Sequence, residues 1–70
     1  VPTVQTETLG IAETSVEFDV PTSGNYIIDF YCQGGANYTA IDDSVSGKVT
    51  LTYEAAASAR AVVCVIKEVS

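Results

Sequence analysis

The stretch SVEFDVPTSGNYIIDFYCQGG, from Ser15 to Gly35, is the most regular part of this 70-residue chain and decides its fold class. Its apolar and polar residues alternate with a period of two, which indicates a β-strand with one buried face. Val16, Phe18 and Val20 share one face of the first segment. The segment PTSG at 21–24 is typical of a turn, because Pro fixes φ and Gly permits a positive φ. We therefore expect two strands that meet in a tight hairpin.

The second segment of this stretch, NYIIDFYC at 25–32, is apolar on both faces. The residues of one face are Tyr26, Ile28, Phe30 and Cys32, and those of the other are Ile27, Asp29 and Tyr31. Strands that are buried on both sides have sequences of this kind. We expect this strand to be central in its sheet or to contact a neighbouring molecule.

The rest of the chain predicts further short strands and no helix of useful length. We expect a turn or bulge at 33–36, a strand at 37–41, a loop at 42–47, a strand at 48–54, a hairpin connection at 55–58 and a long last strand at 59–69. Residues 1–13 are Thr-rich and predict an extended N-terminal arm or an edge strand. About six strands at this spacing predict one all-β domain over 1–70, an antiparallel sandwich or barrel of jelly-roll-like type.

The charge of the chain and the length of its apolar runs argue against two classes of partner. Its net charge is -6, and its basic residues are Lys48, Arg60 and Lys67. Nucleic-acid binding needs a basic surface that displaces counterions. The longest apolar run, AVVCVI at 61–66, is far too short to cross a bilayer. We therefore expect neither nucleic-acid binding nor membrane insertion.

The two cysteines both fall on core-facing positions of predicted strands. Cys32 alternates with Phe30, and Cys64 alternates with Val62 and Ile66. One alternative is a buried disulfide, which would stabilise the fold by about 3–4 kcal/mol in the chain-entropy model. The other is a pair of reduced thiols that pack as small apolar groups. Two Cys without any His do not complete a zinc site.

Catalytic and metal-binding patterns are incomplete. The chain has no His, the commonest general base, and Lys48 and Lys67 lie on outward positions of their predicted strands. The loop DDSVSG at 42–47 resembles the first half of a calcium loop, but the twelfth position from Asp42 is Tyr53. An ordinary hairpin loop is the simpler interpretation. We expect no catalytic residue, cofactor or metal ligand.

Apolar residues outside the predicted core point to a binding surface. The predicted strands at 25–32 and 59–69 are both apolar on two faces, and together they carry more apolar surface than one small core buries. The predicted interface consists of Ile27, Tyr31, Tyr38, Val63 and Val65. Large exposed aromatic residues often anchor protein contacts, although Tyr31 and Tyr38 would also suit stacking on a sugar ring.

The segment VEFDVPTSGNYIIDFY at 16–31 resembles a hairpin of jelly-roll-like modules in fibre, appendage and decoration proteins of phage virions and bacterial surfaces, and also in carbohydrate-binding modules. The short, acidic, Thr/Ser/Val-rich chain is similar to the small capsid-decoration and fibre subunits of tailed phages. This resemblance implies a non-enzymatic structural subunit of a virion surface or extracellular filament, which binds copies of itself or a protein lattice. Two alternatives stay open: a carbohydrate- or cell-surface-binding module, and a small inhibitor of a secreted enzyme stapled by Cys32–Cys64.

Overall fold

The computed structural model describes residues 3–69, and this range contains six strands and no helix. The strands are β1 (Thr3–Leu9), β2 (Ser15–Asp19), β3 (Tyr26–Cys32), β4 (Ala40–Asp42), β5 (Lys48–Thr52) and β6 (Arg60–Glu68). They form two antiparallel sheets in the orders β1-β6-β3 and β2-β5-β4. The prediction of an all-β fold is confirmed. No helix in the described range is long and apolar enough to span a membrane.

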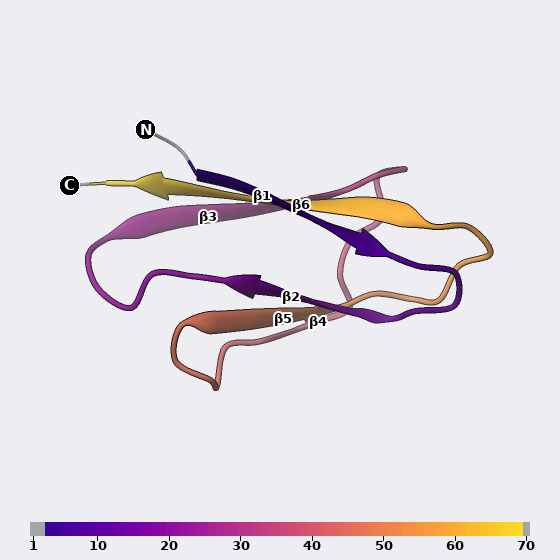
Figure 1. Ribbon diagram of the computed structural model, residues 1–70, viewed down its shortest axis with the longest axis horizontal. Helices are drawn as coiled ribbons and strands as arrows, with labels where there is room; N and C mark the ends of the chain where they lie inside the picture. The colour runs from indigo at the N-terminus through magenta and orange to yellow at the C-terminus, as the bar shows by residue number, and fades with distance from the viewer. Residues whose placement is uncertain (1–2, 70) are drawn as a thin grey trace.

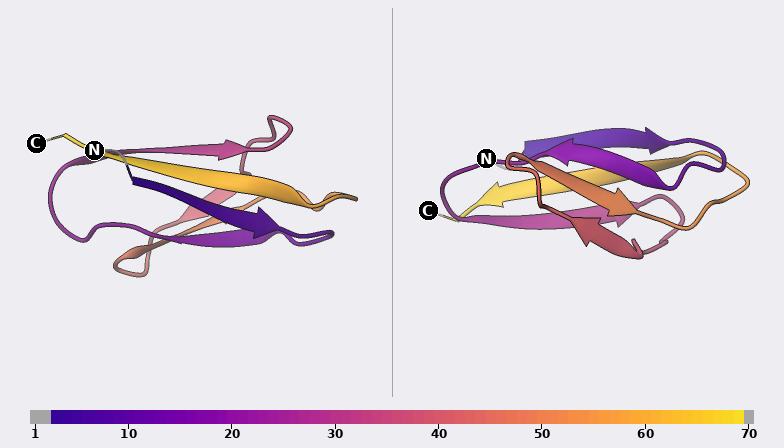
Figure 2. Two further views of the ribbon diagram at one scale, coloured as in Figure 1. Left: turned by 45° about the horizontal axis from the view of Figure 1, so that its top comes forward. Right: turned by 90° about the horizontal axis from the view of Figure 1, so that it is seen from below.

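The two sheets lie as two layers, with the core between them (Figures 1 and 2). The predicted alternation explains which side chains fill this core. Residues at every second position of β2, β5 and β6 are buried: Val16, Phe18, Val49, Leu51, Val62, Cys64 and Ile66, joined by Leu9 and Tyr53. Burial of these apolar side chains is the main stabilising contribution in so small a fold.

The predicted hairpin between β2 and β3 is wrong. β2 belongs to one sheet and β3 to the other, so the turn at 21–24 carries the chain across the core as an arch (Figure 1). Phe18 and Phe30 consequently face each other from opposite layers, with ring centroids 6.2 Å apart. Alternation within each strand is the same in a hairpin and in an arch, because both place one face of each strand on the core.

The predicted hairpin connection at 55–58 is wrong for the same reason, since β5 and β6 lie in different sheets. The loop after β4 does join neighbours, because β4 and β5 pair antiparallel with Asp42 opposite Thr50. The strand predicted at 37–41 is shorter and later, at Ala40–Asp42. The QGGA segment forms the predicted turn, in which Gly34 and Gly35 adopt positive φ and the Gly35 N–H donates to the Cys32 carbonyl at 3.0 Å.

Of the two alternatives for β3, the central position is wrong, because β3 lies at an edge and β6 is central between β1 and β3. Contact of β3 with a neighbouring molecule stays a prediction. β6 is the longest strand, at nine residues, and pairs along its length with both neighbours. Residues 3–9 of the predicted arm or edge strand form β1, which lies at the other edge of this sheet.

Candidate interaction surface

Strand register places four of the predicted interface residues on one outer face. Residues directly opposite each other in antiparallel strands share a face of the sheet. Val63 of β6 is opposite Tyr31 of β3 and Thr6 of β1, and Val65 is opposite Asp29 and Val4. Ile27, two residues before Asp29, shares its face. We call this surface the outer apolar face, consisting of Val4, Ile27, Tyr31, Val63 and Val65.

This face is accessible to a partner. Val4, Ile27 and Tyr31 expose 60%, 51% and 59% of their surface, while Val63 and Val65 of the central strand are half-buried by their neighbours. The polar residues on the same face are Thr6, Thr8, Asp29 and Lys67. A contiguous apolar surface of this kind on a small protein is typical of an interaction site.

The outer face of the opposite sheet has a different composition. It carries Ser15, Glu17, Asp19, Ala40, Asp42, Lys48, Thr50 and Thr52. That is the usual composition of an antiparallel sheet with one face in the core and one in water. The sheet β2-β5-β4 therefore follows the ordinary pattern, and the sheet β1-β6-β3 departs from it.

Tyr38, the fifth predicted interface residue, lies away from the outer apolar face. Its ring packs edge-on against Phe30 at 5.9 Å and against Tyr53 at 6.4 Å, between centroids. These contacts place Tyr38 in an aromatic cluster beside the core. Arg60 extends the cluster, with its guanidinium 6.0 Å from the centroid of the Tyr53 ring.

Burial controls the chemistry of Tyr53. It raises the pKa of the phenol, and the neighbouring Cys32 and Tyr38 raise it further, whereas the Arg60 guanidinium acts to lower it. The Arg60 side chain also donates from Nη2 to the Glu54 carbonyl at 2.9 Å. These contacts hold the aromatic cluster together and leave the Tyr53 hydroxyl protonated at neutral pH.

Both cysteines are free thiols in the structure, which agrees with the second of the two alternatives and not with the disulfide. Cys32 is opposite Val62, and Cys64 is opposite Phe30, so the two cysteines are diagonal rather than direct neighbours on β3 and β6. Diagonal Cα atoms in a sheet lie about 7–8 Å apart, beyond the usual disulfide range of about 4.4–6.8 Å. Burial raises the pKa of the Cys64 thiol, which makes it a poor nucleophile.

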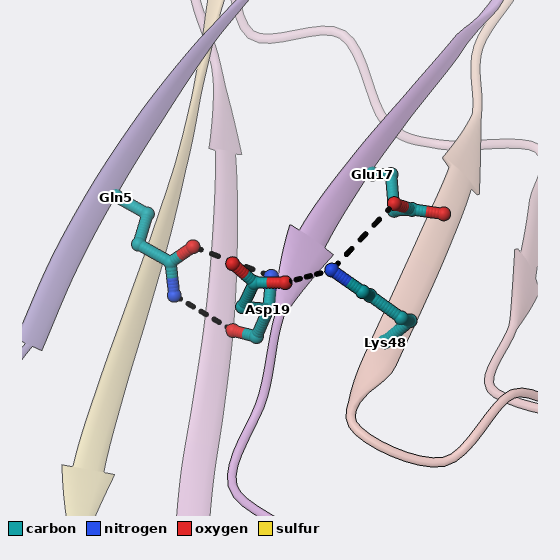
Figure 3. Close-up of polar contacts among 4 residues, drawn as sticks. All are labelled: Gln5, Glu17, Asp19 and Lys48. Atoms are coloured by element: carbon teal, nitrogen blue, oxygen red, sulfur yellow. Dashed lines mark hydrogen bonds and ion pairs between the residues drawn. The ribbon is translucent and has the colours of Figure 1, made fainter.

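A polar cluster joins the two sheets at the β1 and β2 edges (Figure 3). The Gln5 side chain of β1 donates from Nε2 to the Asp19 carbonyl at 2.7 Å, and its Oε1 accepts from the Asp19 N–H at 3.3 Å. The Lys48 ammonium binds the Asp19 carboxylate and lies 4.0 Å from Glu17. These contacts, the hydrogen bond to Asp19 first, raise the pKa of Lys48. Lys48 is therefore a paired surface cation.

An open groove of about 370 Å³ lies next to this cluster and includes Gln5, Asp19, Tyr26 and Glu68 in its lining.

The loop at 42–47 is the segment whose sequence resembles the first half of a calcium loop. In this loop the Asp42 carboxylate accepts from the Ser44 N–H at 2.8 Å, and hydrogen bonding to Ser44 lowers the Asp42 pKa. The carboxylate thus caps its own loop, as in an ordinary turn. Among residues 3–69, no three His, Cys, Asp or Glu side chains are grouped so as to hold a metal ion.

Val4 is the member of the outer apolar face that sequence reasoning missed. The TVQTETL segment is weakly amphipathic, and Val4 stands alone among threonines on its outward side. Only the pairing of Val4 with Val65 reveals its neighbours.

Comparison of the chain with protein-family models, curated proteins and solved structures found no match.

Proposed function

We propose that this chain is a non-enzymatic structural subunit that assembles with copies of itself through the outer apolar face, as in a virion surface or an extracellular filament. The contrast between the two outer faces carries this proposal. One face is polar and acidic, and the other exposes Val4, Ile27 and Tyr31 around two central valines. We take the two facing layers to be a small sandwich. The jelly-roll-like topology of this sandwich stays a prediction.

The composition of the outer apolar face favours a protein partner over a sugar. Sugar-binding platforms combine an aromatic ring with polar groups that bind hydroxyls, and pockets for small ligands are concave. On β6, Val63 is opposite Tyr31, and Ala61 and Val65 are diagonal to it. Aliphatic neighbours of this kind contribute through burial against another apolar surface.

Sedimentation velocity of matched variants tests the proposal. We would change Ile27, Tyr31, Val63 and Val65 to Thr together, which removes apolar surface and places at each position a β-branched residue that suits strands. The expected result is loss of the contact made by this face, with its dissociation constant raised by at least about tenfold, so that the variant forms smaller species than the unchanged chain. The control changes Ile11 and Val45 to Thr, since these exposed apolar residues lie outside the outer apolar face.

The control variant should associate like the unchanged chain. A chain that stays monomeric without any substitution, or an outer-face variant that associates as well as the control, would overturn the proposed function. In the monomer case, quenching of tyrosine fluorescence by soluble sugars would point instead to a carbohydrate-binding module.

A further inference from the structure

The β3 strand presents an open hydrogen-bonding edge. In an antiparallel pair, alternate residues direct their backbone N–H and C=O groups to the partner strand. The Gln33 N–H donates to the Ala61 carbonyl and the Val69 N–H to the Asn25 carbonyl, so odd-numbered residues of this segment face β6. The backbone groups of Tyr26, Ile28 and Phe30 therefore point away from β6. Within residues 3–69 they have no backbone partner.

The other three edge strands are shorter or partly blocked. β4 has three residues. On β2, the side chain of Gln5 occupies both backbone groups of Asp19. β1 lies beside β2 at that same junction and carries Glu7. Natural proteins protect sheet edges in such ways, and a long unprotected edge of β-prone residues accepts another strand. β3 is such an edge, with YIIDFYC over seven residues.

The core beneath β3 is also incompletely covered. Tyr26, Ile28, Phe30 and Cys32 point inward but are only half-buried, whereas Val62, Cys64 and Ile66 of β6 are buried. The opposite layer ends there with the short strand β4, whose inward residue Ile41 is itself exposed. A strand added beside β3 would cover apolar side chains as well as pair backbone groups.

We infer that β3 pairs antiparallel with β3 of a second copy, about a two-fold axis at Ile28. This register places Ile28 opposite Ile28, and Tyr26 opposite Phe30, so the outward backbone groups of all three residues find partners. Their half-buried side chains then lie on one shared inner face. The Cys32 carbonyl is not needed, because it already accepts from the Gly35 N–H.

Asp29 selects this register. A shift of the partner strand by two residues, which moves the axis from Ile28 to Asp29, would place Asp29 directly opposite Asp29, and like charges opposite each other destabilise a sheet. With the axis at Ile28, Asp29 is opposite Ile27 of the second copy instead. The pairing also joins the two outer apolar faces side by side across one six-stranded sheet.

The inference rests on the proposed self-association but uses a different surface. A two-fold contact between two outer apolar faces is isologous and joins two copies. A second isologous contact at β3 allows each such pair to bind further pairs. The two contacts together would generate assemblies larger than a dimer, as a filament or a shell requires.

Chemical synthesis gives the sharpest test, because the chain divides at Cys32 into two segments suited to ligation. We would methylate the backbone nitrogen of Ile28, which removes one outward donor and keeps every side chain. The control is the same methylation at Thr6, whose backbone points away from β6 at the opposite edge of the sheet. Far-UV circular dichroism checks that both chains fold, and sedimentation velocity gives their size.

The expected pattern separates the two proposals. The unchanged chain and the Thr6 control should form species larger than a dimer, whereas the Ile28-methylated chain and the outer-face Thr variant should each stop at a dimer. Combining the two changes should give a monomer. If the Ile28-methylated chain assembles like its Thr6 control, the β3 pairing is wrong. If only the outer-face variant assembles unchanged, the proposed function is wrong and the edge pairing stands.

Cross-linking tests the register independently. In a Cys32→Ser background, the double variant Ile27→Cys with Asp29→Cys should form intermolecular disulfides on mild oxidation. Residues opposite at a non-hydrogen-bonded pair have Cα atoms about 4.5 Å apart, which suits a disulfide. Neither single variant should cross-link comparably. Equally fast cross-linking of Asp29→Cys alone would overturn the axis at Ile28.

Discussion

Individual side chains show how burial sets chemistry in this fold. Tyr53 and Tyr31 are both strand-associated tyrosines, but Tyr53 is buried beside Tyr38 and Arg60, and Tyr31 is exposed on the outer apolar face. Cys64 is buried in the core and Cys32 is half-buried at the end of β3. Each pair provides an internal comparison between a buried group and a more accessible one.

Alkaline pH should distinguish the two tyrosines. Because burial raises the folded-state pKa of Tyr53, its contribution to stability is full below the unfolded pKa of about 10 and is lost as pH rises through the folded value. Tyr53→Phe keeps the ring and removes the titrating group. We expect its free energy of unfolding to fall less than that of the unchanged chain above about pH 10. The measurement is urea denaturation across this range.

Tyr31→Phe is the matched control for that prediction. Because Tyr31→Phe leaves the buried Tyr53 in place, its stability profile should follow that of the unchanged chain. Denaturation should be monitored at concentrations low enough to avoid association. Indistinguishable alkaline profiles for Tyr53→Phe and Tyr31→Phe would contradict the assigned burial of the Tyr53 hydroxyl.

Thiol labelling should separate the cysteines. The half-buried Cys32 should react with an alkylating reagent in the folded protein, whereas Cys64 should react only after denaturation because it is buried and its pKa is raised. Mass spectrometry of the folded chain should therefore find a single label, at Cys32. Protection of both thiols until a reductant is added would indicate a disulfide and contradict the structure.

At the scale of strands, the β4–β5 pair separates core from surface. Leu51 and Ile41 are directly opposite each other, yet Leu51 exposes 0% of its surface and Ile41 exposes 51%. Leu51→Ala should lower the free energy of unfolding by about 2–5 kcal/mol, because it leaves a cavity between the layers. Ile41→Ala should cost less than about 1 kcal/mol. Equal losses in denaturant titration would mean that β4 is not the uncovered edge described.

Strand content was predictable from the sequence, because alternation reports directly on which face is buried. In the segment 48–54, for example, alternation places Val49, Leu51 and Tyr53 on one face, and all three lie in the core. The connections were less predictable, since the turn at 21–24 has the same residues whether its strands pair or face each other across a core. The edge position of β3 was hidden for a related reason: its two apolar faces indicate contact on both sides but not which contacts are intramolecular.

The candidate surface was partly predictable on the same grounds. Alternation along the two strands that are apolar on both faces predicts four of its residues: Ile27, Tyr31, Val63 and Val65. The structure places all four on one sheet. Tyr38 precedes β4 in a segment without regular alternation. Its contacts with Phe30 and Tyr53 therefore could not be predicted from its position along a strand. Val4 required knowledge of long-range pairing.

For the whole molecule, net charge and the apolar face have opposing effects on association. Each copy carries a net charge of -6, so copies repel each other at low ionic strength. Added salt screens this repulsion and leaves apolar contacts intact. We expect the association constant, measured by sedimentation equilibrium, to be larger in about 0.5 M NaCl than in about 0.01 M NaCl. A decrease with salt would indicate that ion pairs, rather than the outer apolar face, hold the copies together.

The most direct test of the central claim is isotope-filtered NMR of a mixed sample, in which only half of the chains carry labelled methyl groups. If the chain assembles through the outer apolar face, we expect intermolecular contacts from the methyl groups of Ile27, Val63 and Val65 and from the ring of Tyr31. Intermolecular contacts confined to the acidic face, at the methyl groups of Thr50 and Thr52, or no such contacts in an associated sample, would contradict assembly through the outer apolar face.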